Sequence, residues 1–178
     1  IQEQNSLPGK TNMFLARKAK AVFTAYPDMQ HFFPDAPTVF TGNPIRETII
    51  KGITDTVSAK EKLGLDPDRL TILSVGGSLG SRTLNNGWKN HLEDLRKSGH
   101  QLIWQTGKLE YPDLSQNNDI KRLGSQILLK EFISDMAEAY SAADIIVSRA
   151  GAIAISELAV AGKPVVLVPF PFAAEDHQ

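Results

Sequence analysis

The chain has 178 residues, 42% of them hydrophobic and 22% charged, a composition typical of a globular protein with room for one domain and part of another. Its formal net charge of −1 indicates no bulk electrostatic attraction to nucleic acid or anionic lipid. It contains no cysteine, which excludes disulfide bonds and thiolate metal sites.

The first part of the chain predicts short elements that end at a turn over Gly42-Asn43-Pro44. These elements are a helix over Thr11–Lys20, a strand over Ala21–Ala25 and an extended segment over Thr38–Phe40. In the helix we expect Met13, Phe14 and Leu15 to face inward. We interpret residues 1–42 as the last elements of one domain with its linker, and residues 43–178 as a second domain.

From Leu70 onward the pattern is regular. Runs rich in Val, Ile and Leu predict five strands, over Leu70–Val75, Gln101–Gln105, Gln126–Lys130, Asp144–Val147 and Pro164–Val168. Amphipathic segments predict helices over Val57–Leu65, Ser81–Lys97, Ser134–Ala142 and Ala152–Ala161. Nearly continuous apolar strands that alternate with helices indicate an α/β fold, with a parallel sheet covered by helices on both faces.

We expect both ends to be cut from a longer protein. The chain begins at Ile1 without a methionine, and it stops at Gln178, a few residues beyond the last predicted strand. An α/β unit normally continues from such a strand into a helix. The second domain is therefore expected to be incomplete at its C-terminus.

The segment from Asp144 to Glu157 predicts a buried strand, a turn of small residues and a helix. Ala150, Gly151 and Ala152 place almost no side chain around the first turn of that helix, so its N–H groups would lie open to an anion. Glu157 lies further along the helix, within reach of hydroxyl groups attached to the anion. This combination favours a nucleotide site. The alternative is a turn of small residues that lets the helix pack closely on its sheet.

The loop Gly76-Gly77-Ser78-Leu79-Gly80-Ser81 follows a predicted strand and opens a helix, which is the context of a phosphate loop. Ser78 replaces the second glycine of the dinucleotide fingerprint, and no Walker A Gly-Lys-Ser/Thr follows. In the binding interpretation, Gly76 and Gly77 let the backbone close on a ligand, with Ser78 as a donor. The alternative is a turn that uses glycine for its backbone angles. Ligands gather at the carboxyl ends of parallel strands, so this loop and the one at Gly151 strengthen each other.

Other polar residues allow two readings each. Arg46 would supply a cation for a diphosphate, or would be a solvated arginine after a turn. Asn5 would bind a sugar hydroxyl, or would cap a turn. Asp66-Pro67-Asp68 resembles a metal-binding Asp-x-Asp motif but predicts a turn before a strand, so we expect no metal there.

Taken together, these motifs resemble one family over essentially the whole chain. They are Gln2–Asn5, Gly42–Arg46, Gly76–Asn85, Ser148–Ala152 with Glu157, and Asp176–Gln178, in this order. They are similar to the MurG family of GT-B glycosyltransferases, inverting hexosyltransferases that transfer N-acetylglucosamine from its UDP donor to lipid I. The product, lipid II, serves bacterial peptidoglycan biosynthesis.

The resemblance implies two Rossmann-like domains with the active site between them, of which this chain holds the end of the first and most of the second. It implies no cofactor, no bound metal and no nucleic acid. It also implies a cytoplasmic protein in bacteria, peripheral on the inner membrane when full-length, with lipid I held mainly by the first domain.

The resemblance also assigns donor-binding roles. Ser78 and Arg46 would contact the diphosphate, beside the helix N-terminus formed by Ala152, Ile153 and Ala154. The remaining contacts would be Glu157 with the ribose hydroxyls, Ile133 with uracil through its backbone, Gln178 with the N-acetylglucosamine hydroxyls, and Asn5 facing the sugar.

Two residues depart from the family pattern. Gln2 stands where many members have His, and Ala154 where many have Thr, so only a backbone contact is expected at Ala154. The catalytic base is unknown, since the resemblance implies that it belongs to the early part of the first domain. We therefore expect the chain to bind the donor weakly without turning it over. Two alternatives stay open: another UDP-N-acetylglucosamine-dependent GT-B or epimerase-type enzyme, and a non-catalytic nucleotide-binding module.

Overall fold

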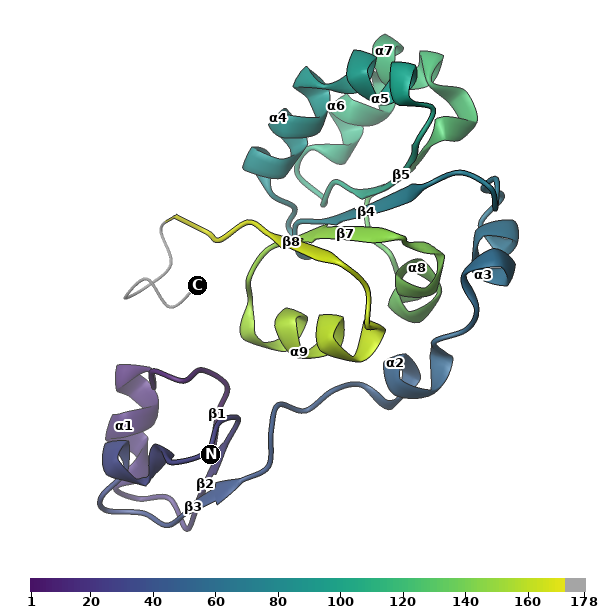
Figure 1. The fold of residues 1–178 in the computed structure, drawn as a ribbon. Coiled ribbons are helices and arrows are strands. Elements are labelled where there is room, and N and C mark those ends of the chain that lie inside the picture. The colour runs from purple at the N-terminus through teal and green to yellow at the C-terminus, as the bar shows by residue number, and fades with distance from the viewer. Residues whose placement is uncertain (172–178) are drawn as a thin grey trace. The chain divides into compact units, whose positions relative to one another are not determined.

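The computed structural model describes residues 1–171, which divide into two compact units (Figure 1). The first unit contains Ile1–Arg46, Ala150–Glu157 and the described residues from Pro169 onward. The second contains Glu47–Arg149 and Leu158–Val168. Within residues 1–171, every helix is too short or too polar to cross a lipid bilayer.

The first unit contains a three-stranded parallel sheet in the order β1-β2-β3. Its elements are β1 (Gln2–Glu3), α1 (Lys10–Ala16), β2 (Val22–Thr24), the 3₁₀ helix η1 (Met29–Phe32) and β3 (Thr38–Phe40). A small core of buried apolar residues holds them together: Ala16, Val22, Met29, Phe33 and Ala36.

The expected orientation of α1 is wrong at two positions. Met13 packs against the core of the first unit, but Phe14 is 69% and Leu15 44% exposed. Successive residues of an α-helix point in directions about 100° apart, so three in a row cannot all face one core. The helix also ends at Ala16, before the predicted Lys20.

The second unit is built on a five-stranded parallel sheet in the order β6-β5-β4-β7-β8. The strands are β4 (Thr71–Val75), β5 (Gln101–Gln105), β6 (Ile127–Lys130), β7 (Ile145–Ser148) and β8 (Val165–Leu167). The five predicted strands are confirmed, each end lying within one residue of its expected position. The parallel α/β fold is confirmed with them.

Helices cover both faces of this sheet, as Figure 1 shows. On one face lie α4 (Arg82–Asn90), α5 (Leu92–Ser98), α6 (Tyr111–Gln116) and α7 (Asn118–Arg122), and the 3₁₀ helix η2 (Gly124–Gln126) leads into β6. On the other face lie α3 (Thr56–Lys62) and α8 (Met136–Ala142), with α2 (Glu47–Gly52) against α8. The helix α9 (Ala152–Ala161) joins β7 to β8.

The single helix expected over Ser81–Lys97 is two helices. His91 ends α4 and precedes α5, and its backbone angles of φ −120° and ψ 19° are not helical. The helices α2, α6 and α7 were not predicted, because their five or six residues are too few for a helical period to be visible.

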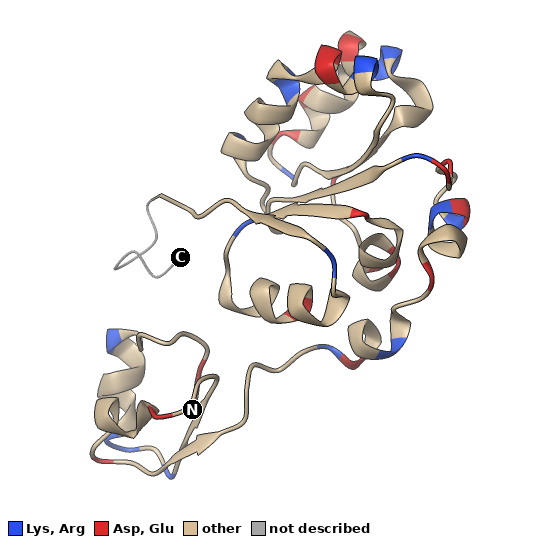
Figure 2. Cartoon of the chain, in the orientation of Figure 1, with Lys and Arg blue, Asp and Glu red and all other residues tan. Residues whose placement is uncertain are grey.

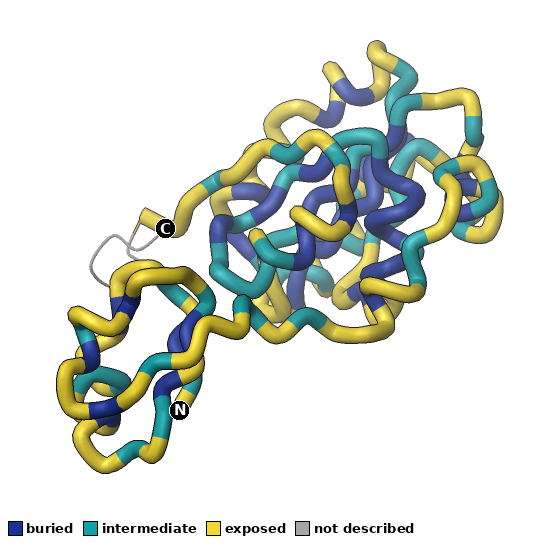
Figure 3. Tube along the Cα trace, turned by 60° about the horizontal axis from the view of Figure 1, so that its bottom comes forward, coloured by how far each residue is buried: buried dark blue, intermediate teal, exposed yellow. Residues whose placement is uncertain are grey.

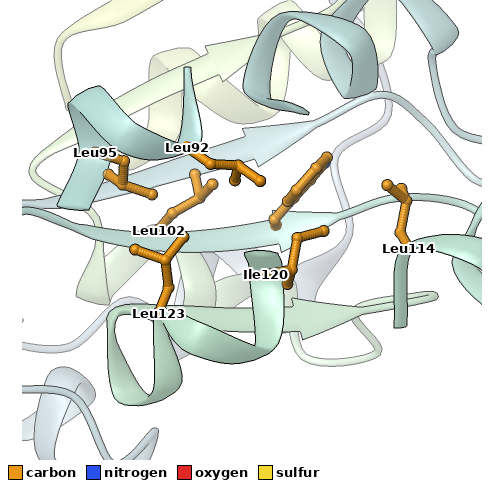
Figure 4. Close-up of a cluster of buried hydrophobic side chains, with 7 residues drawn as sticks. Leu92, Leu95, Leu102, Leu114, Ile120 and Leu123 are labelled. Carbon is orange, nitrogen blue, oxygen red and sulfur yellow. The ribbon is translucent and has the colours of Figure 1, made fainter. Parts of the chain in front are cut away.

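A hydrophobic core of the second unit lies between β5 and the helices α5, α6 and α7 (Figure 4). Leu92 and Leu95 of α5 meet Leu102 of β5, and the remaining members are Trp104, Leu114, Ile120 and Leu123. Figure 3 shows how buried residues concentrate inside this unit, whereas Figure 2 shows that Lys, Arg, Asp and Glu positions occur along its outer helices. Burial on both faces explains why the strands read as continuous apolar runs.

The strand order places the candidate loops. From one edge of the sheet to the other, the strands lie in the order β6, β5, β4, β7 and β8. The chain therefore adds strands toward one edge from β4 to β6 and toward the other edge from β7 to β8, so the direction of winding reverses between β4 and β7. These two strands pair in register up to Val75 and Ser148, their last residues. In doubly wound sheets, ligands bind beyond the carboxyl ends of the strands at this reversal. The residues after Val75 and Ser148 are the two small-residue loops.

Candidate nucleotide-binding site

The β4–α4 loop, residues 76–81, needs its glycines for internal reasons. A Cβ on Gly76 would lie 2.6 Å from the backbone nitrogen of Ser81, and one on Gly80 would lie 2.0 Å from the carbonyl oxygen of Thr106. Gly77 and Gly80 also have positive φ angles of +88° and +83°. The requirements of the turn itself, its backbone angles and its close contacts, are therefore enough to explain these glycines without a ligand. The loop nonetheless presents Ser78, which is exposed.

The end of the loop is fixed by a helix cap. The Ser81 hydroxyl accepts a hydrogen bond from the N–H of Leu84 at 3.4 Å, and Ser81 itself is buried. Capping leaves the loop between Gly76 and Ser81 as a preformed backbone turn at the carboxyl end of β4.

The turn before α9 is different. Gly151 has no positive φ, and a Cβ placed on it would meet no atom of the described chain within 4 Å. Close packing is therefore not the reason for glycine at this position, although Ala150 beside it is buried. Ala152, Ile153 and Ala154 form the first turn of α9 and are partly exposed. The anion-binding role expected for this helix start stays a prediction.

Glu157 and Arg46 meet within the first unit. Arg46 Nε donates to Glu157 Oε1 at 3.1 Å and Nη2 donates to Oε2 at 3.3 Å, a two-point ion pair. Glu157 is the only acidic residue of α9 and is buried, whereas the Arg46 side chain is 53% exposed. Each carboxylate oxygen can accept more than one hydrogen bond.

Side-chain hydrogen bonds of Asn43 hold the polar turn before Arg46. Its Nδ2 donates to Ser156 Oγ at 3.1 Å and to the carbonyl oxygen of Gln4 at 3.3 Å. Its Oδ1 accepts from Gln2 Nε2 at 3.3 Å. The sequence showed Asn43 only as part of a motif, without a contact of its own.

Glu3 holds Asn5, a role that sequence reasoning missed. Glu3 is 1% exposed, and its carboxylate accepts from Asn5 N–H at 2.9 Å, Asn5 Nδ2 at 3.3 Å and Asn12 Nδ2 at 2.9 Å. Asn5 also lines a cavity of about 70 Å³ with Ala150 and Ala152 in the first unit. The buried carboxylate thus orients the asparagine that the sequence singled out.

Ile133 follows β6 and is buried. Its N–H donates to the side-chain oxygen of Gln105 at 2.9 Å, so this backbone donor has an acceptor inside the protein. Ile133 and the exposed Phe132 line a cavity of about 200 Å³ in the second unit. Gln178, expected to bind the sugar, lies outside the described residues.

A further cation lies at the end of β7. Arg149 is partly buried, and burial lowers the pKa of its guanidinium below the usual arginine value. Arginine nonetheless stays protonated at neutral pH. One guanidinium nitrogen of Arg149 donates to the carbonyl oxygen of Val168 at 3.1 Å. It adds positive charge at the strand end where an anion is expected.

The Asp66-Pro67-Asp68 segment is a turn, as predicted. Asp66 Oδ1 accepts from the N–H of Asp68 at 3.0 Å, and its Oδ2 pairs with Arg69 at 3.1 Å. The turn precedes β4, so it lies at the opposite end of the strand from the Gly76 loop. Within residues 1–171, no group of three or more His, Asp or Glu side chains is placed to hold a metal ion.

Comparison with known proteins identifies the family and the fold of this chain. Residues 71–178 match the model of the family described as glycosyltransferase family 28 C-terminal domain. The chain is 48% identical to the UDP-N-acetylglucosamine--N-acetylmuramyl-(pentapeptide) pyrophosphoryl-undecaprenol N-acetylglucosamine transferase of Parabacteroides distasonis, over all of this chain and 48% of that protein. A protein of the same name from Cytophaga hutchinsonii is 47% identical over all of this chain and 47% of its own length. The chain thus spans about half the length of the curated relatives it matches.

Solved structures support the same fold. The crystal structure of Acinetobacter baumannii MurG matches 99% of this chain and 47% of its own, with a TM-score of 0.65 and 34% identity. Os79 from O. sativa, solved in complex with UDP, matches 88% of this chain and 38% of its own, with a TM-score of 0.63. At 19% identity, the likeness to Os79 concerns the fold alone.

Proposed function

The chain belongs to glycosyltransferase family 28, and on that premise we propose that it carries the UDP-sugar-binding part of an inverting N-acetylglucosaminyltransferase. The proposed donor is UDP-N-acetylglucosamine and the proposed acceptor is lipid I, which gives lipid II for bacterial peptidoglycan. The names of the relatives from Parabacteroides distasonis and Cytophaga hutchinsonii support this choice of donor and acceptor. The full-length protein would work on the cytoplasmic face of the inner membrane, where its acceptor is anchored.

The observation that carries the proposal is Glu157. It is a buried carboxylate on a helix whose first residues are partly exposed, and that helix follows the strand at which the sheet reverses its winding. We propose that this carboxylate accepts hydrogen bonds from the ribose hydroxyls of the nucleotide. The N–H groups at the start of α9 would then hold the diphosphate.

The chemical role of this part is to stabilise the leaving group. Transfer with inversion breaks the bond between the anomeric carbon and the β-phosphate oxygen, and the departing UDP takes the bonding electrons. Fixed N–H dipoles at Ser78 and at Ala152–Ala154, with the guanidinium of Arg46, would stabilise the negative charge that develops on the phosphate oxygens. A base must also remove the acceptor proton, and we propose that the rest of the full-length protein supplies it.

The base subsite would lie at Ile133. Because its N–H already donates to Gln105, we propose that its carbonyl oxygen accepts from the uracil ring. Phe132 and the adjoining cavity of about 200 Å³ would accommodate the ring.

The test is a calorimetric titration of the 178-residue chain with UDP, UDP-N-acetylglucosamine and NAD. We expect both uridine nucleotides to bind and NAD not to bind. Glu157→Ala should weaken UDP binding by about tenfold or more, since a charge-assisted hydrogen-bond pair is lost. The matched control is Glu93→Ala, which removes an exposed carboxylate from the first turn of α5, and Glu93 does not line the cavity proposed for the base.

The remaining outcomes discriminate between functions. Absence of any nucleotide binding by the native chain contradicts the donor-binding proposal and favours a non-catalytic module. Acceptor specificity of the full-length protein separates the lipid I transferase from other UDP-N-acetylglucosamine-dependent enzymes. Transfer to a lipid I analogue by the purified 178-residue chain would contradict the division of labour proposed here.

A further inference from the structure

Gln105 connects two loops that the proposed function uses. It is the last residue of β5 and is 3% exposed. Its Nε2 donates to the carbonyl oxygen of Gly77 at 2.9 Å, and its Oε1 accepts from the N–H of Ile133 at 2.9 Å. A single amide group thus joins the β4–α4 loop to the β6–α8 loop.

The chemistry of these two bonds demands an amide. One partner is a backbone acceptor and the other a backbone donor, so the side chain must donate at one atom and accept at another. A carboxylate accepts only and an ammonium donates only, whereas glutamine does both in one planar group. Because the site is buried, loss of either bond would leave a backbone group without its partner.

The surroundings of Gln105 are rigid. Gly107 and Gly80 lie so close that a Cβ on Gly107 would be 2.1 Å from the backbone nitrogen of Gly80. Asn85, which is 1% exposed, donates to the carbonyl oxygen of Thr106 at 2.9 Å and accepts from Trp104 Nε1 at 2.9 Å. These contacts hold the end of β5, and with it the Gln105 amide, in place.

We propose that Gln105 is a positioning residue for the donor: it sets the spacing between the loop that holds the diphosphate and the loop that meets the base. The inference rests on the proposed function. UDP must meet both loops at once, so holding them in place beforehand lowers the ordering cost of binding. Because the donor and the acceptor of the Gln105 amide both bond to loop backbone, its effect on the nucleotide passes through Gly77 and Ile133.

The chain contains a matched control in the same strand. Gln101 is the first residue of β5 and is 2% exposed. Its Oε1 accepts from the N–H of Asp66 at 2.8 Å, and its Nε2 donates to the carbonyl oxygen of Asp66 at 2.9 Å. Loss of this amide should cost similar stability, but it lies at the opposite end of the strand from the loops.

The experiment compares Gln105→Met with Gln101→Met in the 178-residue chain. Methionine keeps the length of the side chain and removes its amide. We expect both variants to lower the thermal unfolding midpoint to a similar extent. Only Gln105→Met should accelerate hydrogen exchange at the Ile133 amide and in residues 77–81, and only it should weaken UDP binding, by about tenfold. Should it fail to fold, Gln105→Glu, which keeps the acceptor for Ile133 but loses the donor to Gly77, takes its place in the same assays.

The outcomes separate the two proposals. If the native chain binds UDP and Gln105→Met binds it as tightly as Gln101→Met does, the positioning role is wrong. If the native chain binds no UDP, the proposed function fails instead. Hydrogen exchange then still decides whether Gln105 braces the loops, because an unchanged rate at Ile133 overturns the inference with or without a ligand.

Discussion

The two small-residue loops of the chain look alike in sequence but differ in what the structure requires of them. In the β4–α4 loop, Gly76 and Gly80 have no room for a Cβ, and Gly77 and Gly80 have positive φ angles. In the β7–α9 turn, Gly151 has no positive φ and has space around it within the described chain. A glycine points to a ligand most strongly where the protein itself has no need of it. By that criterion, Gly151 is better evidence for a binding site than the glycines of the β4–α4 loop. The β4–α4 loop is a turn whose shape the protein itself requires.

The largest expected effect tests the first half of this comparison. Gly80→Ala should lower the free energy of unfolding by about 2 kcal/mol or more, because the new Cβ would strike the Thr106 carbonyl and the backbone would be strained. Thermal and urea unfolding measure this cost. The control is Gly87→Ala in the exposed middle of α4, which should stabilise the chain by about 0.5–1 kcal/mol. If Gly80→Ala left the free energy of unfolding unchanged, the β4–α4 loop would not need its glycine, and the distinction drawn between the two loops would be wrong.

The second prediction tests the other half. Gly151→Ala should leave the free energy of unfolding within about 0.5 kcal/mol of the native value, because the new methyl group meets nothing in the described chain. UDP binding should nevertheless weaken by about tenfold, since the methyl group stands where the diphosphate would approach the start of α9. Calorimetric titration beside thermal unfolding measures both. A large loss of stability without loss of binding would return Gly151 to a packing role.

The third prediction concerns the ion pair in the first unit. Arg46→Lys keeps the positive charge but loses the two-point hydrogen bonding to Glu157. We expect UDP affinity to fall by about threefold to tenfold, with a smaller change for uridine, which has no phosphate. An equal loss for UDP and uridine would show that Arg46 serves only to orient Glu157.

The smallest expected effect is on stability, at Asp55, which lies outside both loops. It serves as a reference for the size of the other changes. Asp55 caps α3 by accepting from the N–H of Ser58, and these hydrogen bonds lower the pKa of its carboxyl below the usual value. Because the pKa is lowered in the folded state, the stabilisation is complete above the unfolded pKa of about 3.9 and is lost as pH falls through the folded pKa. Asp55→Ala should lower the unfolding midpoint slightly at pH 7. Its difference from the native chain should shrink at acidic pH, with UDP affinity unchanged at pH 7.

Much of the fold of the second unit was predictable from local sequence. The strands of a parallel sheet are buried on both faces, so they appear as apolar runs whose ends are visible without knowledge of their neighbours. Short helices such as α6 and α7 were not predictable, because five or six residues span too few turns to show a period. The break at His91 was missed because the apolar pattern continues through it, from Trp88 to Leu92 and Leu95, which all belong to one core.

For the candidate site, the division follows the range of the interactions. The small-residue turn before α9 and the position of Glu157 on that helix lie within one strand–turn–helix segment, so the sequence by itself determined them. Three features were decided only by the tertiary structure: the pairing of Arg46 with Glu157 across 111 positions, the bridge of Gln105 to Gly77 and Ile133 across 28 positions on either side, and the steric need for Gly80. These depend on which strands become neighbours. A local pattern reports how one segment is buried and capped, whereas long-range hydrogen bonds exist only after the sheet has brought distant loops to one edge.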